Sequence, residues 1–229
     1  MKNEKAAKII EKALKQGRKT LSEYEAKQVL AAYGIPITKE VLVKDKDQIE
    51  KGINKIGFPM VMKGCSAEIA HKTEKGLIHV DVRNATEVKK AFRDIMKGME
   101  GFKGGVLMQE MIKGRRELVI GLTRDPQFGP CVMFGLGGIF TEILRDVCFR
   151  RAPLELRDAM DMMQEIKGHK ILAAVRGMEA ADTDLLAQML INVGQIGLDF
   201  DDVMEIDLNP VILAGAKPVV VDALIVLKG

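Results

Sequence analysis

The sequence predicts an α+β protein of two lobes, and three observations support this fold class. The chain has 229 residues, 47% apolar and 29% charged, which is an ordinary globular composition and enough chain for two small lobes. Segments with helical periodicity alternate with short apolar runs rich in Val and Ile, which are typical of strands. Four glycines also fall within the eight positions 98–105, where we expect a hinge between the lobes.

The first part of the chain predicts an N-terminal helix followed by a small α+β lobe. Residues 5–16 place apolar side chains on one helical face, and Ser22 with Glu25 forms the capping-box pattern that begins a second helix. The further elements expected are strands at 41–43, 58–62 and 77–82 and helices at 45–56 and 85–99. We therefore expect an N-terminal helical arm at residues 1–20 and a first lobe at 21–105.

The remainder, residues 106–229, predicts a second lobe with a mostly antiparallel sheet and helices packed on it. Strands are expected at 106–112, 117–123, 131–134, 141–149, 203–206, 211–213 and 219–227. Helices are expected at 156–166 and 184–196.

Charge and composition exclude several classes of protein. The net charge is +3, but residues 1–20 alone carry seven basic and two acidic side chains, so the rest of the chain is slightly acidic. Aromatic residues make up only 4%, without Trp, which argues against a nucleic-acid binder. No apolar run approaches the roughly 18 residues of a membrane span, and we see no signal peptide, so a cytoplasmic protein is expected. The basic arm is either a solvated helix face or a docking surface for an acidic partner.

Three cysteines, Cys65, Cys131 and Cys148, occur without a CxxC spacing. An odd number without such spacing favours a reducing compartment and argues against a zinc site. Buried, unreactive thiols are the expected role for all three.

A pair of carboxylates around residue 112 is a candidate purine-nucleoside site. A purine needs an acceptor for its amino group, backbone hydrogen bonds and an apolar slot, and a ribose needs an acceptor for its hydroxyls. Glu110, the backbone near Ile112, and Glu117 could supply these groups. Two exposed carboxylates flanking a hairpin are the alternative interpretation.

A second candidate site is formed by Asn209 and Asp222, which we expect at the ends of two adjacent strands. An amide oxygen and a carboxylate are hard ligands that suit Mg²⁺, whose remaining ligands are water and nucleotide phosphates. The alternative for Asn209 is turn chemistry, since it precedes Pro210. Asp222 lies among apolar residues, where a carboxylate needs a partner.

The polar segment 63–76 is a candidate for phosphate chemistry. Lys63 follows an apolar strand, where an ammonium group needs an anion, and a nucleotide phosphate is a natural partner. His71 lies in a stretch without periodicity, where an imidazole could act as a nucleophile toward phosphorus; an exposed histidine without a role is the alternative. Gly137 and Gly138 belong to a glycine-rich run that would let the backbone approach a phosphate, or else form a simple turn.

Taken in order, these motifs resemble an ATP-grasp domain, and specifically the β subunit of ADP-forming acetyl-CoA synthetases. The resemblance covers essentially the whole chain. The resemblance rests on five short motifs: the opening Leu21-Ser-Glu-Tyr-Glu-Ala-Lys, the loop His71-Lys-Thr-Glu-Lys-Gly, and the later runs Gly135-Leu-Gly-Gly-Ile-Phe-Thr-Glu, Phe149-Arg-Arg-Ala-Pro and Glu205-Ile-Asp-Leu-Asn-Pro. One departure is Leu77, where the family pattern leads us to expect a second glycine.

The resemblance implies an acid–CoA ligase that converts acyl-CoA, ADP and phosphate into acid, CoA and ATP with Mg²⁺. The two lobes would hold ADP or ATP between them, and a separate CoA-binding α subunit would complete an α2β2 assembly needed for activity. By the same resemblance His71 would carry a phosphoryl group. Lys63, Glu110, Ile112, Glu117, Gly137 and Gly138 would bind the nucleotide, and Asn209 and Asp222 the metal. An ATP-grasp ligase that joins a carboxylate to an amine, and a nucleotide-sensing subunit without turnover, are the alternatives.

Overall fold

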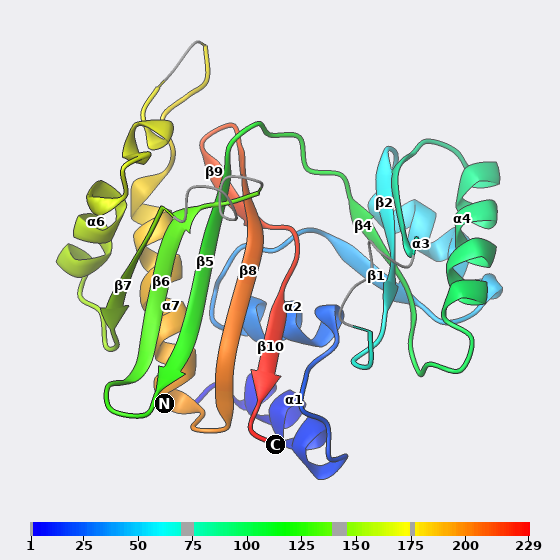
Figure 1. Cartoon of the computed structure of the whole chain (residues 1–229). Coiled ribbons are helices and arrows are strands. Elements are labelled where there is room, and N and C mark those ends of the chain that lie inside the picture. Colours follow the sequence, from blue (N-terminus) through cyan, green and yellow to red (C-terminus); the bar gives the residue numbers. More distant parts are fainter. Residues whose placement is uncertain (1, 70–75, 139–145, 175–176) are drawn as a thin grey trace. The chain divides into compact units, whose positions relative to one another are not determined.

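The computed structural model describes residues 2–69, 76–138, 146–174 and 177–229 (Figure 1). Contacts divide the chain into two compact units, each described here by itself. Unit 1 comprises Met1–Leu21, Glu25–Ile37 and Ile112–Gly229, and unit 2 comprises Ser22–Tyr24 and Thr38–Met111. No helix in the described ranges has the length and apolar character needed to cross a membrane.

Unit 2 is a four-stranded antiparallel sheet in the order β1-β4-β2-β3, with two helices on one face. Its elements are β1 (Glu40–Val43), η1 (Lys46–Gln48), α3 (Ile49–Ile56), β2 (Met60–Cys65), β3 (Ile78–Val82), α4 (Ala85–Gly98) and β4 (Gly105–Glu110). Alternate strand residues such as Met60, Met62 and Met108 pack against Val88 and Ile95 of α4 in one buried cluster. This unit is a small α+β lobe, but its bounds differ from the expected 21–105: β4 belongs to it, and most of α2 belongs to unit 1.

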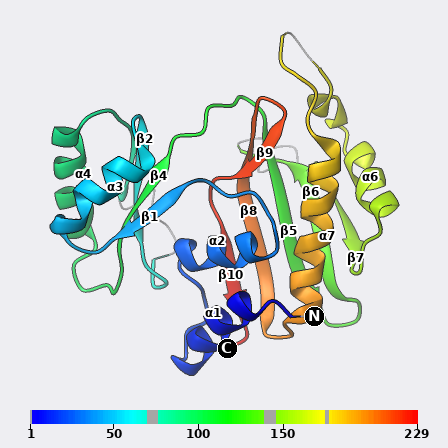
Figure 2. The same ribbon diagram turned by 180° about the vertical axis from the view of Figure 1, so that it is seen from behind.

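Unit 1 contains a six-stranded antiparallel sheet in the order β10-β8-β5-β6-β7, with β9 paired to β8. Its elements are α1 (Glu4–Lys15), most of α2 (Glu23–Ala32), β5 (Glu117–Asp125), β6 (Gly129–Leu136), β7 (Val147–Arg151), α6 (Leu156–Glu165), η2 (His169–Leu172), α7 (Thr183–Asp199), β8 (Val203–Ala214), β9 (Lys217–Val220) and β10 (Leu224–Leu227). In Figures 1 and 2, α1, α2 and α7 lie on the same side of this sheet.

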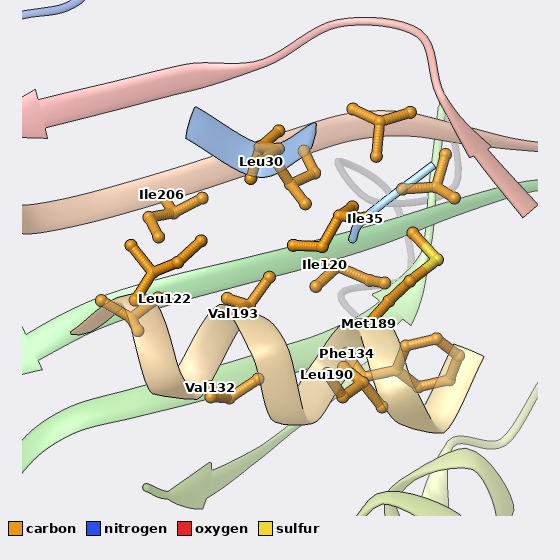
Figure 3. Packing of buried hydrophobic residues seen from close by; sticks show 14 of the residues in the cluster. Leu30, Ile35, Ile120, Leu122, Val132, Phe134, Met189, Leu190, Val193 and Ile206 are labelled. Carbon is orange, nitrogen blue, oxygen red and sulfur yellow. The ribbon is translucent and has the colours of Figure 1, made fainter. Parts of the chain in front are cut away.

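The core of unit 1 lies between this sheet and α7. Figure 3 shows the interlocking side chains, which include Ile120, Leu122, Val132 and Phe134 from the strands and Met189, Leu190 and Val193 from α7. These strand residues alternate along β5 and β6, so one face of each strand is buried against the helix. The predicted antiparallel sheet with helices on it is confirmed.

The N-terminal helix is part of unit 1 and not a separate arm. Ala6, Ile10 and Ala13 of α1 are at most 2% exposed and belong to the same buried cluster as α7. Asn3 caps the helix by accepting hydrogen bonds from the amides of Lys5 and Ala6. The lysines of α1 are therefore its solvent face, and residues 1–20 belong to unit 1, whose first segment ends at Leu21.

The glycine-rich segment 98–105 is not a hinge between the units. It joins α4 to β4 inside unit 2, and the chain crosses to unit 1 between Met111 and Ile112. A Cβ atom at Gly105 would lie 2.6 Å from the carbonyl oxygen of Val43 on the neighbouring strand. The glycine is needed there because β4 is paired on both sides, not because the backbone bends.

The C-terminal strands also differ from the prediction. Residues 203–214 form one continuous strand, β8, where two had been expected, and 219–227 forms two strands interrupted at 221–223. Pro210 has no backbone N–H to donate to a neighbouring strand. β8 nevertheless continues through it, because the residues before and after Pro210 are paired with β5, β9 and β10. Asp222 thus lies between two strands and not within one.

Candidate functional site

Asn209 and Asp222 are brought to matching positions by the register of the sheet. β9 pairs Val220 with Val211, and β10 pairs Leu224 with Asp207. Both pairings share one register, which places Asp222, in the interruption, opposite Asn209 on β8. Asn209 is exposed and Asp222 is half-buried, with one carboxylate oxygen accepting a hydrogen bond of 2.8 Å from the Ala223 amide. The predicted pair therefore lies together, although Asn209 is in the interior of a strand and not at its end.

Asp207 is a further acidic residue at this position, which sequence reasoning did not single out. It lies two residues before Asn209 on the same face of β8. Burial, together with the smaller effect of the charges of Glu205 and Asp222, raises the pKa of its carboxyl group from 3.8 to about 6. The alternation Glu205-x-Asp207-x-Asn209 was the available signal, because three polar side chains with a period of two share one face of a strand.

The glycine-rich run after β6 meets Glu117 and Asn209. The Gly137 amide donates to the carbonyl oxygen of Glu117 at 2.8 Å, and the Gly138 amide faces Asn209 Oδ1 at 3.5 Å. Gly138 has a φ of +64°, and a Cβ atom there would overlap the Glu117 carboxylate. Four predicted positions of unit 1 (Glu117, Gly137, Gly138 and Asn209) are therefore neighbours, and a backbone this close needs glycine.

In unit 2 the structure gives Lys63 a different anion partner from the phosphate expected. Lys63 lies inside β2, and its Nζ is 2.8 Å from Glu23 Oε1 at the start of α2, with side chains 6% and 1% exposed. A buried ammonium group needs such a partner. The sequence could not indicate Glu23, because the two residues are 40 positions apart.

Glu110 ends β4 and is bound to the backbone. Its Oε1 accepts a hydrogen bond of 2.7 Å from the Lys39 amide, and its own amide donates to the Lys39 carbonyl at 3.0 Å. Glu110 and Glu117 do not flank a hairpin, because β4 and β5 belong to different sheets and units. Ile112 is half-buried and is the first residue of unit 1 after the crossing.

His71 lies outside the described residues, but both flanks of its segment are described. Ile69 and Leu77 are 4% and 1% exposed and belong to the core of unit 2. Leu77 fills space that Gly98 leaves open, since a Cβ atom at Gly98 would lie 2.6 Å from Leu77 Cδ2. Its carbonyl also accepts from the Gly64 amide at 2.8 Å. The leucine found in place of the expected glycine is thus a core residue.

The donor set around Asn209 fits a magnesium ion. In the described parts of the chain there is no cluster of three His, Cys, Asp or Glu residues arranged to hold a metal. Mg²⁺ does not require one, because it is usually held by one or two carboxylates together with phosphates and water.

The prediction of buried thiols holds for two of the three cysteines. None of the three forms a disulfide; Cys65 and Cys148 are buried and Cys131 is half-buried. Burial raises the pKa of the Cys148 thiol to about 11. A thiol that stays protonated at neutral pH is a poor nucleophile.

Comparison with known proteins identifies the class first. The ATP-grasp domain family matches residues 12–227, and the two units carry the helices and antiparallel sheets of that fold. The chain is 46% identical to the β subunit of ADP-forming acetate–CoA ligase II of Pyrococcus furiosus, and the alignment covers 100% of both chains.

Solved structures give the same result. The dinucleotide-forming acetyl-coenzyme A synthetase 1 of Ca. Korarchaeum cryptofilum, in complex with coenzyme A and Ca-AMPCP, matches with a TM-score of 0.93 and 43% identity over 97% of this chain and 100% of that one. A second structure of that enzyme, with coenzyme A and Mg-AMPPCP, matches with a TM-score of 0.86 and 44% identity over the same shares. The chain therefore belongs to the family of ATP-grasp β subunits of ADP-forming acetyl-CoA synthetases.

Proposed function

We propose that this chain is the subunit that makes ATP in an ADP-forming acyl-CoA ligase, by transferring a phosphoryl group from His71 to ADP. The observation that carries the proposal is the gathering of Glu117, Gly137, Gly138, Asn209 and Asp222 in unit 1, in a chain that matches the family from end to end. An acyl-CoA, ADP and phosphate are consumed, and the acid, CoA and ATP are formed.

Each described residue has a role that follows from its chemistry. The exposed amide of Asn209 and the Asp222 carboxylate would hold Mg²⁺, which when bound neutralises charge on the nucleotide phosphates. The backbone at Gly137 and Gly138 would face those phosphates. Glu110 has a second carboxylate oxygen for a purine amino group, the backbone at Ile112 would bind the purine edge, and Glu117 would accept a ribose hydroxyl.

Lys63 could contribute to phosphate binding by exchanging or sharing its partner Glu23. In the transfer the N–P bond of phosphohistidine breaks, and a new P–O bond forms at the β-phosphate of ADP.

The flanks of the His71 segment support a role in transfer. Ile69 and Leu77, which flank the segment, are both part of the core of unit 2. In the related Korarchaeum enzyme a phosphohistidine segment points towards the nucleotide-binding site. The partner that forms the acyl phosphate would be a CoA-binding α subunit, and we expect an α2β2 heterotetramer.

The test combines the purified chain with its α subunit, acyl-CoA, ADP and phosphate. His71→Ala should abolish ATP formation while the affinity for ADP is unchanged, and His79→Ala, on β3, serves as the matched control. Incubation with γ-labelled ATP should label the wild-type chain at an acid-labile site and leave His71→Ala unlabelled. ATP formation by His71→Ala at the wild-type rate would refute the relay. Amide formation from a carboxylate and an amine would favour the alternative ligase, and nucleotide binding without turnover would favour a sensing subunit.

A further inference from the structure

A groove on unit 2 has the properties of a second ligand site. It has a volume of about 520 Å³ and is lined by Lys46 and Asp47 of η1, Ile49 of α3, and Thr86, Lys89, Phe92 and Arg93 of α4. Every lining residue belongs to unit 2, so the groove is formed within one compact unit. Its volume is within the range of small-molecule sites, about 300–1,000 Å³.

The groove combines an apolar floor with a cationic rim. Ile49 and Phe92 are 6% and 7% exposed and form the floor. Lys89 and Arg93 are four residues apart, so they lie on the same face of α4, and Lys46 faces them from η1. Within the described ranges no ion pair joins Lys46, Lys89 or Arg93 to a carboxylate, although Asp47 lines the same groove.

This groove is separate from the candidate nucleotide residues of unit 2. Met60 and Met62 of β2 pack in the same cluster as Phe92 of α4, on the helical face of the sheet. Successive strand residues point to opposite faces, so Lys63, which is paired with Glu23 of α2, points away from α3 and α4. A molecule bound at Lys63 would therefore be on the other side of the sheet from a molecule in the groove.

We propose that the groove binds a small amphipathic anion, in which a phosphate or carboxylate head meets Lys46, Lys89 and Arg93 and an apolar body covers Ile49 and Phe92. Three cations without ionic partners attract a negative head, and Arg93 can bind it through two parallel hydrogen bonds. The floor favours an apolar body, because contact with it removes apolar surface from water. Asp47 and the Thr86 hydroxyl can bind a hydroxyl or amine group on the same molecule.

The test is amide-shift mapping by NMR on the full chain with four probes: phenyl phosphate, inorganic phosphate, benzoate and phenol. Phenyl phosphate or benzoate should change the amide chemical shifts of residues 46–49 and 86–93. The ligand of these two that binds more tightly identifies the preferred head group. Inorganic phosphate should bind more weakly and phenol should not bind. Lys89→Glu/Arg93→Glu should weaken binding at least about tenfold, because two cations that would meet the anionic head become carboxylates that repel it.

The matched control is Lys90→Glu/Lys97→Glu, which makes the same change of charge on exposed positions of α4 that do not line the groove. An equal loss of binding in this control would mean non-specific attraction and overturn the proposal. Equal affinities for phenyl phosphate and inorganic phosphate would also overturn it, as would shifts confined to other residues. Shifts at the groove caused by the purified α subunit, but not by any probe, would assign the groove to protein contact and overturn the small-molecule site.

Discussion

The buried ion pair between Lys63 and Glu23 offers the sharpest test of how unit 2 is stabilised. The Nζ–Oε1 distance is 2.8 Å, and both side chains are almost fully buried. At an effective dielectric constant of about 20, two charges at this separation attract by about 6 kcal/mol, which offsets the cost of taking both out of water. Lys63→Met removes only one charge of the pair and keeps the other, the Glu23 carboxylate, in its buried position.

We expect Lys63→Met to lower the free energy of unfolding by about 3–5 kcal/mol, the usual cost of breaking a buried pair from one side. For a chain of this size that corresponds to a decrease in Tm of roughly 6–20 °C. Urea unfolding and calorimetry of the full chain at neutral pH measure both quantities. The double variant Glu23→Gln/Lys63→Met should cost less than the sum of the single variants, with a coupling energy of about 1–3 kcal/mol.

The control is the exposed ion pair of Arg83 and Asp81 in the same unit, whose side chains are 71% and 39% exposed. Arg83→Met should leave the unfolding midpoint close to that of the wild type, because water solvates the remaining Asp81 carboxylate. A change for Lys63→Met no larger than for this control would refute the reasoning, as would additive effects of the two buried substitutions.

Two further predictions concern the metal pair and the thiols. Asp222→Ala should weaken binding of Mg-nucleotide about tenfold or more but change binding of metal-free nucleotide little. Calorimetry measures both affinities, with the exposed Asp201→Ala as the control. Equal losses of the two affinities in Asp222→Ala would exclude a metal role. Because the pKa of Cys148 is raised to about 11, its alkylation in the folded chain should be negligible at neutral pH and rise toward pH 11. Burial also raises the pKa of Cys131, but this thiol is only half-buried and should react first. Mass spectrometry of peptides after alkylation measures the order, and earlier labelling of Cys148 would contradict the prediction.

The sequence by itself determined the elements and much of the candidate site. The helical stripe of α4 and the Val- and Ile-rich runs of β8 and β10 contain their own periodicity, so their type could be predicted locally. The motifs around Glu117, Gly137 and Asn209 were found for the same reason, because each is a short run of residues with a recognisable chemistry.

Only the tertiary structure decided which groups meet. Glu23 as the partner of Lys63 depends on packing across 40 positions of the chain, and the position of Asp222 directly opposite Asn209 depends on strand register. Gly105 was predicted to belong to a hinge, whereas its backbone lies close to the neighbouring strand. A sequence does not distinguish a glycine in a bend from a glycine required by such close packing. Local periodicity reports which face of an element is buried, whereas the identity of the atoms opposite that face is set by non-local pairing.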